Sequence, residues 1–546
     1  MDESLWWRDG VIYQIYPRSF SDSNNDGFGD LNGIINKLGY LSNLGVDALW
    51  LSPIHPSLDV DFGYDVSDYY AIDSRYGTMN DFDRLMVDAH KKNIRIILDM
   101  VLNHTSDQHP WFQQSRLSRD NAYSDWYLWR ESLPNGKPPN NWQSMTGGGG
   151  WEFDPLREQY YFHMFYKQQP DLNWRNPAVC KAMMDILRFW LEKGVDGFRF
   201  DVFNVFFKDK DFKNNPRKLG IRKFDCQHHV FDCDQPDLIP GLEEIRKLMD
   251  SFGDRYSVGE PFLPTPEKAA KYSAPGRLNA AFNFEFLTCS WKPDKFLQTI
   301  LYSDQILDQE SWSTYVLNNH DNKRSASRFT RGEDDRMLKA AAALLLTQRG
   351  TPFLYYGEEI GMRNVRLQKS EIKDPVGLHY WPFYIGRDGC RSPMQWNASE
   401  NGGFSKASPW MKVHPDHPFR NVADQQENSI SLFNFYKRLI QLRKENAALR
   451  RGAFIPLTYN PRKILAYLRQ TGDQTILVVI NFSWHPVKFF LGTVLARENW
   501  QLLLSSKREV LDNLKKDVFE LSAYEAIILK QSPNPGDVQS QEVNGL

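Results

Sequence analysis

The fold of this chain is constrained most by a regular alternation of short apolar segments with longer amphipathic ones. Residues 11–16, 46–51 and 95–101 are apolar runs of the length that buried strands have. Between them, residues 31–44 and 81–92 place apolar side chains about every 3.6 residues, which is typical of helices. Because a helix between two strands returns the chain to the same edge of a sheet, this order predicts a parallel sheet.

Five further segments have the same strand-like character. They are residues 197–201, 256–260, 280–286, 315–318 and 352–356. With the first three they make eight strands, the number in a (β/α)8 TIM barrel, so we predict that α/β fold. A doubly wound open sheet is the alternative that the same alternation allows. In a barrel, the chemistry lies on the loops that follow the strands.

A long interruption and a late change of pattern divide the chain. We expect residues 1–104 and 174–451 to form the two parts of the barrel. Residues 105–173, rich in Trp, Gly and Pro, are too many for an ordinary loop and predict an inserted subdomain over the C-terminal edge of the strands. Residues 452–531 predict a C-terminal antiparallel β-domain, and residues 532–546, which lack aromatic side chains, predict a disordered tail.

The composition excludes several classes of partner. Lys and Arg number 66 against 68 Asp and Glu, a net charge of -2, so neither nucleic acid nor an anionic membrane surface is expected. The five cysteines are scattered without metal-ligand spacing, which favours reduced thiols. No basic and apolar leader and no apolar run of about 18 residues is present. We therefore expect a cytoplasmic protein without a membrane partner.

Polar residues follow four of the predicted strands at the point where each strand ends. They are the segments Asp99 to His104, Arg199 to Asp201, Gly259-Glu260 and Asn318 to Asp321. Arg199 and Asp201 alternate along one strand and so point to the same face, where the arginine is expected to hold the carboxylate ionised. A lone Arg-x-Asp pattern more often marks a structural ion pair. The four segments together instead predict an active site at the C-terminal edge of a barrel.

These segments resemble the motifs of the α-amylase superfamily of glycoside hydrolases, and within it the oligo-1,6-glucosidase and α-glucosidase branch. The resemblance spans nearly the whole chain, and residues 169–174, Gln-Pro-Asp-Leu-Asn-Trp, are a mark of this branch. It implies that Asp201 is the nucleophile, Glu260 the general acid/base, and Asp321 a third carboxylate that stabilises the transition state. A retaining glycosidase needs one ionised carboxylate and one protonated carboxyl about 5–5.5 Å apart. Burial and neighbouring carboxylates are therefore expected to raise the pKa of Glu260.

The resemblance also implies a pocket that is closed around one glucose. Asp61 and Arg387 resemble the pair that closes its blind end in this branch. Tyr64 is expected to stack on the sugar, with Phe165 and Gln169 completing the wall. A closed pocket implies that glucose is removed one unit at a time from a chain end.

Further sugar contacts are implied by the motifs at the strand ends. His104 and His320 are expected to donate hydrogen bonds to hydroxyl groups of the bound glucose, and Arg199 lies among the substrate-binding residues. For each histidine alone, a structural role with satisfied hydrogen bonds is the more common one. The motif context favours the sugar-binding role.

One polar loop has the pattern of a cation site. Residues 22–30 place oxygen-bearing side chains at alternate positions, with a glycine for the turn, as loops that bind hard cations do. An ordinary polar turn is the alternative. The resemblance implies one structural Ca²⁺, or Mg²⁺, and no organic cofactor. The implied ligands are Asp22, Asn24, Asp26, Asp30 and the Phe28 carbonyl.

The expected activity is that of a retaining exo-α-glucosidase acting on short gluco-oligosaccharides. In this branch a valine directly after the nucleophile, here Val202, accompanies preference for α-1,6 (isomaltose-type) bonds, because a β-branched side chain narrows the path of the leaving sugar. The alternatives are an α-1,4-glucosidase of the maltase or sucrase type, and a glucosyl transferase of the trehalose synthase or sucrose isomerase type. A non-enzymatic, transporter-associated relative is disfavoured by the retained carboxylates. The oligomeric state, monomer or homodimer, stays open.

Overall fold

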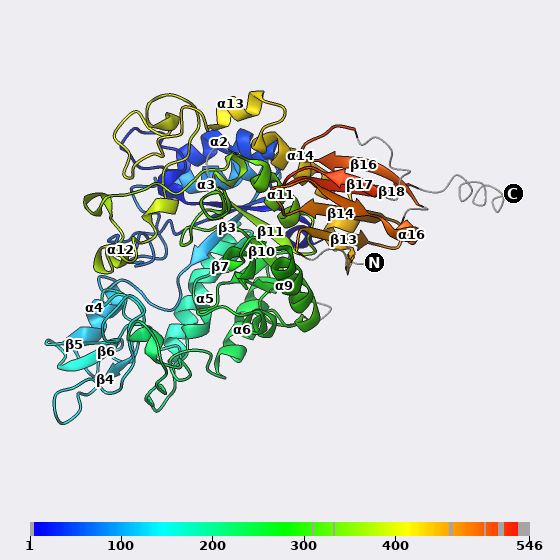
Figure 1. The fold of residues 1–546 in the computed structure, drawn as a ribbon. Coiled ribbons are helices and arrows are strands. Elements are labelled where there is room, and N and C mark those ends of the chain that lie inside the picture. Colours follow the sequence, from blue (N-terminus) through cyan, green and yellow to red (C-terminus); the bar gives the residue numbers. More distant parts are fainter. Residues whose placement is uncertain are drawn as a thin grey trace.

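The computed structural model describes residues 5–307, 311–330, 334–457, 462–495, 498–510 and 518–532. Figure 1 shows a barrel of strands and helices, a small subdomain that projects from one end, and a separate β-domain. Apart from Ser532, the predicted disordered tail lies outside the described residues. Within the described part of the chain, no helix is both long and apolar enough to cross a membrane. All five cysteines carry free thiols.

Eight strands form one sheet in the described residues, in the order β10-β11-β1-β2-β3-β7-β8-β9, and every pair in it is parallel. They are β1 (Ile12–Ile15), β2 (Ala48–Leu51), β3 (Arg95–Met100), β7 (Gly197–Phe200), β8 (Tyr256–Gly259), β9 (Ala280–Ala281), β10 (Thr314–Val316) and β11 (Thr351–Tyr355). Between the two edge strands, Thr314 Oγ1 donates a hydrogen bond to the Ala281 carbonyl at 3.3 Å. The sheet is thus a nearly closed barrel, which confirms the predicted TIM-barrel architecture and excludes the open sheet.

One predicted strand is wrong in its length. Residues 280–286 were expected to be extended, but only Ala280 and Ala281 are, and the chain then enters the short helix α8 (Glu285–Thr288). Phe284 has a φ of 52°, in the left-handed region, which an extended strand does not tolerate. The apolar side chains still pack, because Phe282 and Phe284 stack with ring centroids 5.1 Å apart. A run of buried aromatics therefore gave the appearance of a longer strand.

Helices cover the outside of the barrel in Figure 1. They include α2 (Leu31–Leu44), α3 (Met79–His90), α5 (Pro177–Glu192), α6 (Leu238–Asp250), α7 (Pro266–Tyr272), α9 (Pro293–Ile306), α11 (Arg336–Leu346) and α14 (Leu432–Glu445). Helix α5 leads into the strand that precedes Asp201. The Asn176 side chain caps it by accepting from the Ala178 amide at 2.9 Å, and Pro177 occupies its first turn. Gly194 follows at a φ of 92°, a value that suits glycine where the helix stops.

Side chains along each strand point alternately into the interior of the barrel and outward to the core that the helices cover. Ile12, Trp50 and Ile97 belong to an apolar cluster that fills the interior, whereas Leu49 and Phe198 pack outward against the helices. Successive inward positions further along the strands are polar. Asp99 pairs in register with Arg199 on the neighbouring strand. The interior is therefore apolar toward the N-terminal ends of the strands and charged toward their C-terminal ends.

The segment between β3 and α5 carries its own small sheet. It holds the helix α4 (Pro110–Leu117) and the strands β4 (Trp129–Arg130), β5 (Trp151–Asp154) and β6 (Gln159–Phe162), which pair antiparallel in the order β4-β6-β5. Bridges between His104 and Asp171, and between Tyr127 and Leu172, join the two ends of the segment. These contacts hold the subdomain beside the loop that follows β3.

The C-terminal region is an antiparallel β-domain. One sheet has the order β12-β13-β14-β18-β16, and β15 pairs with β17. The strands are β12 (Ala453–Pro456), β13 (Ile464–Gln470), β14 (Thr475–Asn481), β15 (Val487–Phe490), β16 (Asn499–Ser505), β17 (Val518–Leu521) and β18 (Ala526–Ser532). Phe482 stacks on Trp291 of the barrel with centroids 4.4 Å apart, so the two domains share an apolar contact.

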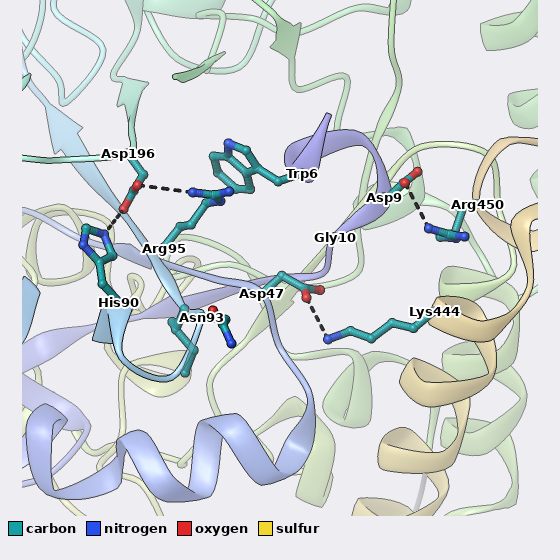
Figure 2. A pocket seen from close by; sticks show the side chains of 11 residues that line it. Trp6, Asp9, Gly10, Asp47, His90, Asn93, Arg95, Asp196, Lys444 and Arg450 are labelled. Carbon is teal, nitrogen blue, oxygen red and sulfur yellow. Dashed lines mark hydrogen bonds and ion pairs between the residues drawn. The ribbon is translucent and has the colours of Figure 1, made fainter. Parts of the chain in front are cut away.

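A hollow of about 500 Å³ lies at the opposite end of the barrel from the polar strand ends. Figure 2 shows that its charged side chains are paired with one another. Asp196 contacts His90 at 2.7 Å, and Asp47 contacts Lys444 of α14 at 2.7 Å. Residues at the N-terminal face of a barrel serve stability rather than chemistry. We therefore infer that the charged pairs around this hollow hold α14 against the barrel.

Candidate active site

Arg199 is the centre of the charged cluster at the C-terminal end of the barrel. Its side chain, 1% exposed, contacts Asp99 Oδ1 and Asp201 Oδ1 through Nη1, both at 2.7 Å. Its other terminal nitrogen, Nη2, pairs with Glu260 Oε2. Burial opposes the charge of the guanidinium, but Asp99 and Asp201 outweigh it and raise the pKa of Arg199. One permanent cation is thus shared by three carboxylates.

This sharing differs from the simple pair expected between Arg199 and Asp201. Burial raises the pKa of Asp201 to about 6, Arg199 opposes that rise, and Asp99 adds to it. The arginine therefore limits the rise in pKa without cancelling it. Asp201 is mostly ionised at neutral pH but titrates well above an ordinary aspartate. Arg199 also contacts Glu260, and the raised pKa expected for the Glu260 carboxyl stays a prediction.

The residue after Asp201 has an unusual backbone. Val202 has a φ of 35° and a ψ of 39°, in the left-handed region that β-branched residues rarely adopt. Its side chain is 8% exposed and belongs to an apolar cluster with Phe224 and Phe262. Packing of the Val202 side chain in this cluster therefore stabilises the turn in which Asp201 lies, directly after β7.

Asp321 lies on the other side of the site, in the loop after β10. Its Oδ1 is 2.7 Å from Arg391 Nη2 and 3.5 Å from Arg387 Nη1, and its Oδ2 is 3.3 Å from His320 Nε2. Burial lowers the pKa of His320 to about 3, so the ring is neutral at neutral pH. Burial alone would raise the pKa of Asp321, but His320 and the guanidinium groups of Arg387 and Arg391 hold it below its usual range. Asp321 is therefore ionised.

An ion pair spans the residues expected at the blind end of the pocket. Arg387 Nη2 is 2.7 Å from Asp61 Oδ1, and Arg387 Nε is 3.0 Å from Asp374 Oδ2. Gln169 Nε2 donates to Asp61 Oδ2 at 3.4 Å. These contacts bring together loops from four parts of the chain. The Arg387 guanidinium thus pairs with two carboxylates, those of Asp61 and Asp374.

The remaining predicted sugar-binding residues lie around the same cluster. The Tyr64 ring is parallel to the His320 ring at 5.5 Å, and its hydroxyl lies 2.7 Å from His320 Nε2 and 3.0 Å from Asp99 Oδ2. His104 Nε2 contacts the Tyr64 carbonyl at 3.0 Å, and its ring lies 5.3 Å from that of Phe165. The structure thus gathers every predicted catalytic and sugar-binding residue at one end of the barrel.

Sequence reasoning missed three charged members of this cluster. Asp99 was noted in its motif but given no role, although a buried acid at an inward strand position was a signal for one. Arg391 stands four residues after Arg387 and had no periodic pattern to mark it. The Asp374 side chain accepts a hydrogen bond from the Val376 amide at 3.2 Å and so caps a short helix. In the sequence, an aspartate directly followed by Pro375 therefore resembled an ordinary capping residue.

The polar loop of residues 22–30 forms a tight, hydrogen-bonded turn. The Asp22 carboxylate accepts from the Gly27 amide at 2.9 Å, and Asp30 accepts from the Ser23 amide at 2.8 Å. Three carboxylates, an amide and a backbone carbonyl are the oxygen donors that a hard cation prefers. Within the described residues, no three His, Cys, Asp or Glu side chains gather as a metal cluster. The oxygen donors are of the kind that suits Ca²⁺ or Mg²⁺, but the structure does not gather the three carboxylates as a cluster, and the cation site stays a prediction.

Comparison with known families adds an independent observation. Residues 14–452 match the family described as "Alpha amylase, catalytic domain". Residues 455–528 match the family described as "Maltogenic Amylase, C-terminal domain". The boundary between the two matches falls where the structure passes from α-helices to the C-terminal β-domain.

Relatives of this chain are similar over most of their length. The oligo-1,6-glucosidase of Parageobacillus thermoglucosidasius is 39% identical over 539 residues, which cover 92% of this chain and 95% of the relative. A probable alpha-glucosidase of Rhizobium meliloti is 41% identical over 493 residues, covering 88% and 89% of the two chains. Among solved structures, the alpha-glucosyl transfer enzyme XgtA is 37% identical with a TM-score of 0.91, covering 97% of this chain and all of the other. A mutant of the trehalulose synthase MutB is 35% identical with a TM-score of 0.89 and the same coverage.

Proposed function

The chain belongs to the α-amylase family of glycoside hydrolases, and from that premise we propose that it is a retaining exo-α-glucosidase acting on short gluco-oligosaccharides. The observation that carries the proposal is the sharing of Arg199 between Asp201 and Glu260. Two carboxylates held by the two terminal nitrogens of one guanidinium are near neighbours, which supports a double displacement, in which the carboxyls lie about 5–5.5 Å apart. We therefore assign Asp201 as nucleophile and Glu260 as general acid/base.

The proposed reaction has two steps. The Asp201 carboxylate attacks the anomeric carbon while Glu260 gives its proton to the leaving oxygen, which forms a glucosyl ester on Asp201. Glu260 then takes a proton from water, whose oxygen attacks the same carbon and releases glucose with its configuration retained. To the ionised Asp321 we assign the role of accepting hydrogen bonds from the sugar and stabilising the positive charge of the transition state.

The ion pair between Asp61 and Arg387 supports removal of single glucose units. Both side chains are held by further contacts, Asp61 by Gln169 and Arg387 by Asp374. A pocket closed by such a pair has no room for a sugar beyond the terminal glucose, so only a chain end can enter. We propose that Tyr64, His104, His320 and Phe165 line the rest of this pocket.

We propose that α-1,6 bonds are preferred over α-1,4 bonds. Several relatives at 36–39% identity are named oligo-1,6-glucosidase. Val202 directly follows the proposed nucleophile and shares an apolar cluster with Phe262, and we infer that its β-branched side chain narrows the path of the leaving sugar. The experiment that tests this proposal is a side-by-side measurement of kcat/KM for isomaltose, maltose, sucrose and trehalose.

A lead for isomaltose of about tenfold or more is expected, since one methyl group in a tight site discriminates by that order. A lead for maltose or sucrose would contradict the linkage preference and leave the rest of the site assignment intact. Product analysis with sucrose separates hydrolysis from isomerisation, the alternative that the sequence left open. Free glucose and fructose are expected, whereas a rearranged disaccharide would contradict the hydrolase assignment.

The activity is expected to fall as the pH drops through about 6, because burial raises the pKa of Asp201 to about 6. The nucleophile works only when ionised, so activity is present above this pKa and is lost below it. The acid limb of kcat/KM, which reports the free enzyme, measures this pKa. Circular dichroism at each pH controls for unfolding. A limb centred near the ordinary aspartate pKa of about 4 would contradict the reading.

We propose one structural cation, Ca²⁺ or Mg²⁺, in the loop of residues 22–30. Its removal by a chelator is expected to lower the melting temperature, because a ligand at about 100 times its Kd stabilises by roughly 2.7 kcal/mol. The variant Asp26→Ala should melt at the temperature of the chelator-treated protein, and added calcium should not raise that temperature. A melting temperature that does not respond to calcium or chelator in the unchanged protein would exclude the site.

A further inference from the structure

We propose that Glu358 is a positioning residue for the reaction, because its buried carboxyl holds the loop that carries Asp321. This inference rests on the proposed function, in which the ionised Asp321 stabilises the transition state. Glu358 lies in the turn after β11, on the short 3-10 helix η4 (Glu358–Ile360). Neither step of the proposed reaction assigns it a role.

The turn after β11 brings the Glu358 side chain back toward the barrel. Gly357 and Gly361 stand on either side of η4 with φ values of 77° and 69°, in the left-handed region that favours glycine. Two such residues in one short turn let the chain leave the strand and reverse at once. Glu358 is therefore only 4% exposed, and its carboxyl faces the loop after the neighbouring strand β10.

The loop that carries Asp321 is closed at its base by the Asn318 side chain. The Asn318 amide oxygen accepts from the Ser325 backbone amide, and Asn318 Nδ2 donates to Ser325 Oγ at 3.2 Å. Asn318 lies shortly after β10, and Ser325 begins the helix α10 (Ser325–Phe329). One side chain thus joins both ends of the loop, and His320 and Asp321 lie between these ends.

Glu358 fixes the position of this Asn318 amide. A backbone N–H group only donates, so the Asn318 oxygen must face the Ser325 amide, and its nitrogen must find acceptors. One acceptor is Ser325 Oγ, and the other is Glu358 Oε2. The second carboxyl oxygen, Glu358 Oε1, accepts from the Tyr436 hydroxyl of α14 at 3.0 Å. Glu358 therefore ties the base of the loop to helix α14.

The Glu358 carboxyl holds Asn318 in either protonation form. Burial raises the pKa of Glu358 to about 7. The ionised form accepts from both Asn318 and Tyr436. The protonated form still accepts from Asn318 at one oxygen and donates its own proton to the Tyr436 oxygen, because a phenol oxygen also accepts. A glutamine at this position, which has one accepting oxygen and a donating nitrogen, should therefore hold the loop as well.

The backbone of Asp321 depends on the base of this loop. Asn319, the residue directly after Asn318, accepts from the Asp321 amide through Oδ1 at 3.0 Å. From this backbone position the Asp321 carboxylate reaches Arg391 Nη2 at 2.7 Å. A shift of Asn318 would move Asn319 and then Asp321, and a displacement of about 1 Å in an active site costs about 100-fold in rate. Loss of the Glu358 contact should therefore act on the transition state through Asp321.

Two substitutions of Glu358 separate the hydrogen bond from the space that the side chain fills. Glu358→Met removes both acceptors and should lower kcat for 4-nitrophenyl α-glucoside about 10- to 100-fold, with a smaller change in KM. Glu358→Gln keeps an acceptor for Asn318 and should stay within about threefold of the unchanged protein. If Glu358→Met does not fold, Asn318→Ala removes the other half of the contact and should give the same loss of kcat.

Glu359→Met is the matched control, because it removes a buried carboxyl from the next position of the same turn. Glu359 is 0% exposed and accepts from the hydroxyls of Tyr13, at 2.7 Å, and Tyr40. These tyrosines belong to β1 and α2 rather than to the loop after β10. Glu359→Met should lower the melting temperature about as much as Glu358→Met and leave kcat unchanged.

A double-mutant cycle decides whether Glu358 acts through Asp321. In an Asp321→Asn background, Glu358→Met should lower kcat by no more than about threefold further. The full loss in that background, or equal losses of kcat in Glu358→Met and Glu359→Met, would mean that Glu358 only supports the fold and would overturn the inference. An unchanged kcat in folded Glu358→Met overturns it too. If the unchanged protein releases no 4-nitrophenol, the proposed function fails instead, so the two failures are distinguishable.

Discussion

The variant Asp201→Ala is expected to lose about 10⁴-fold or more in kcat while it keeps its fold, because this carboxylate is the proposed nucleophile on which the glucosyl ester would form. The fold should survive because Arg199 keeps two other carboxylate partners, Asp99 and Glu260. No buried cation is therefore left alone, which is the usual reason why removing one member of an ion pair destabilises a protein. Steady-state rates with an aryl glucoside and a melting curve measure the two expectations.

A second variant separates the nucleophile from the acid. Glu260→Ala should lose most activity on a disaccharide, whose leaving oxygen needs a proton, and much less of the first step on 4-nitrophenyl α-glucoside, whose phenolate leaves unprotonated. Asp201→Ala should be inactive on both substrates. If Asp201→Ala kept more than about a hundredth of the rate, or if the two variants behaved alike on both substrates, the assigned roles would be wrong.

The variant Asp61→Ala is expected to lower kcat/KM by about 10²- to 10³-fold, mainly through KM. Asp61 and Arg387 form a pair at 2.7 Å whose side chains are only 11% and 17% exposed. Breaking such a pair costs about 3–5 kcal/mol, and much of that cost is the uncompensated partner. Here Asp374 remains 3.0 Å from Arg387 Nε, which reduces the cost to the fold and places the loss in sugar binding.

The control for this prediction is Asp68→Ala. Asp68 is an exposed aspartate seven residues along the same loop, and its carboxylate accepts only the Tyr70 amide at 2.8 Å among the contacts of the described residues. It should leave kcat/KM unchanged. An unchanged KM in Asp61→Ala, measured with the same disaccharide, would remove this ion pair from the sugar site and with it the argument for cleavage at chain ends.

Part of the site could be predicted from the sequence because it depends on patterns among residues that lie close together in the chain. The inward position of Arg199 and the ends of the strands follow from a period of two residues. The cap of α5 by Asn176 follows from the residue types at a helix start. The strand expected over residues 280–286 was misread because a buried aromatic run has no period that separates a strand from a short helix.

The sequence by itself determined the barrel, the C-terminal β-domain and the strand ends where the polar motifs lie, since periodicity and turn residues act over a few positions. Only the tertiary structure decided how these motifs share their charges. Arg199 meets Glu260 across 61 positions, and Arg387 meets Asp61 across 326, so no local pattern announces either contact. The raised pKa of Asp201 has the same origin, because burial depends on every element packed around the group.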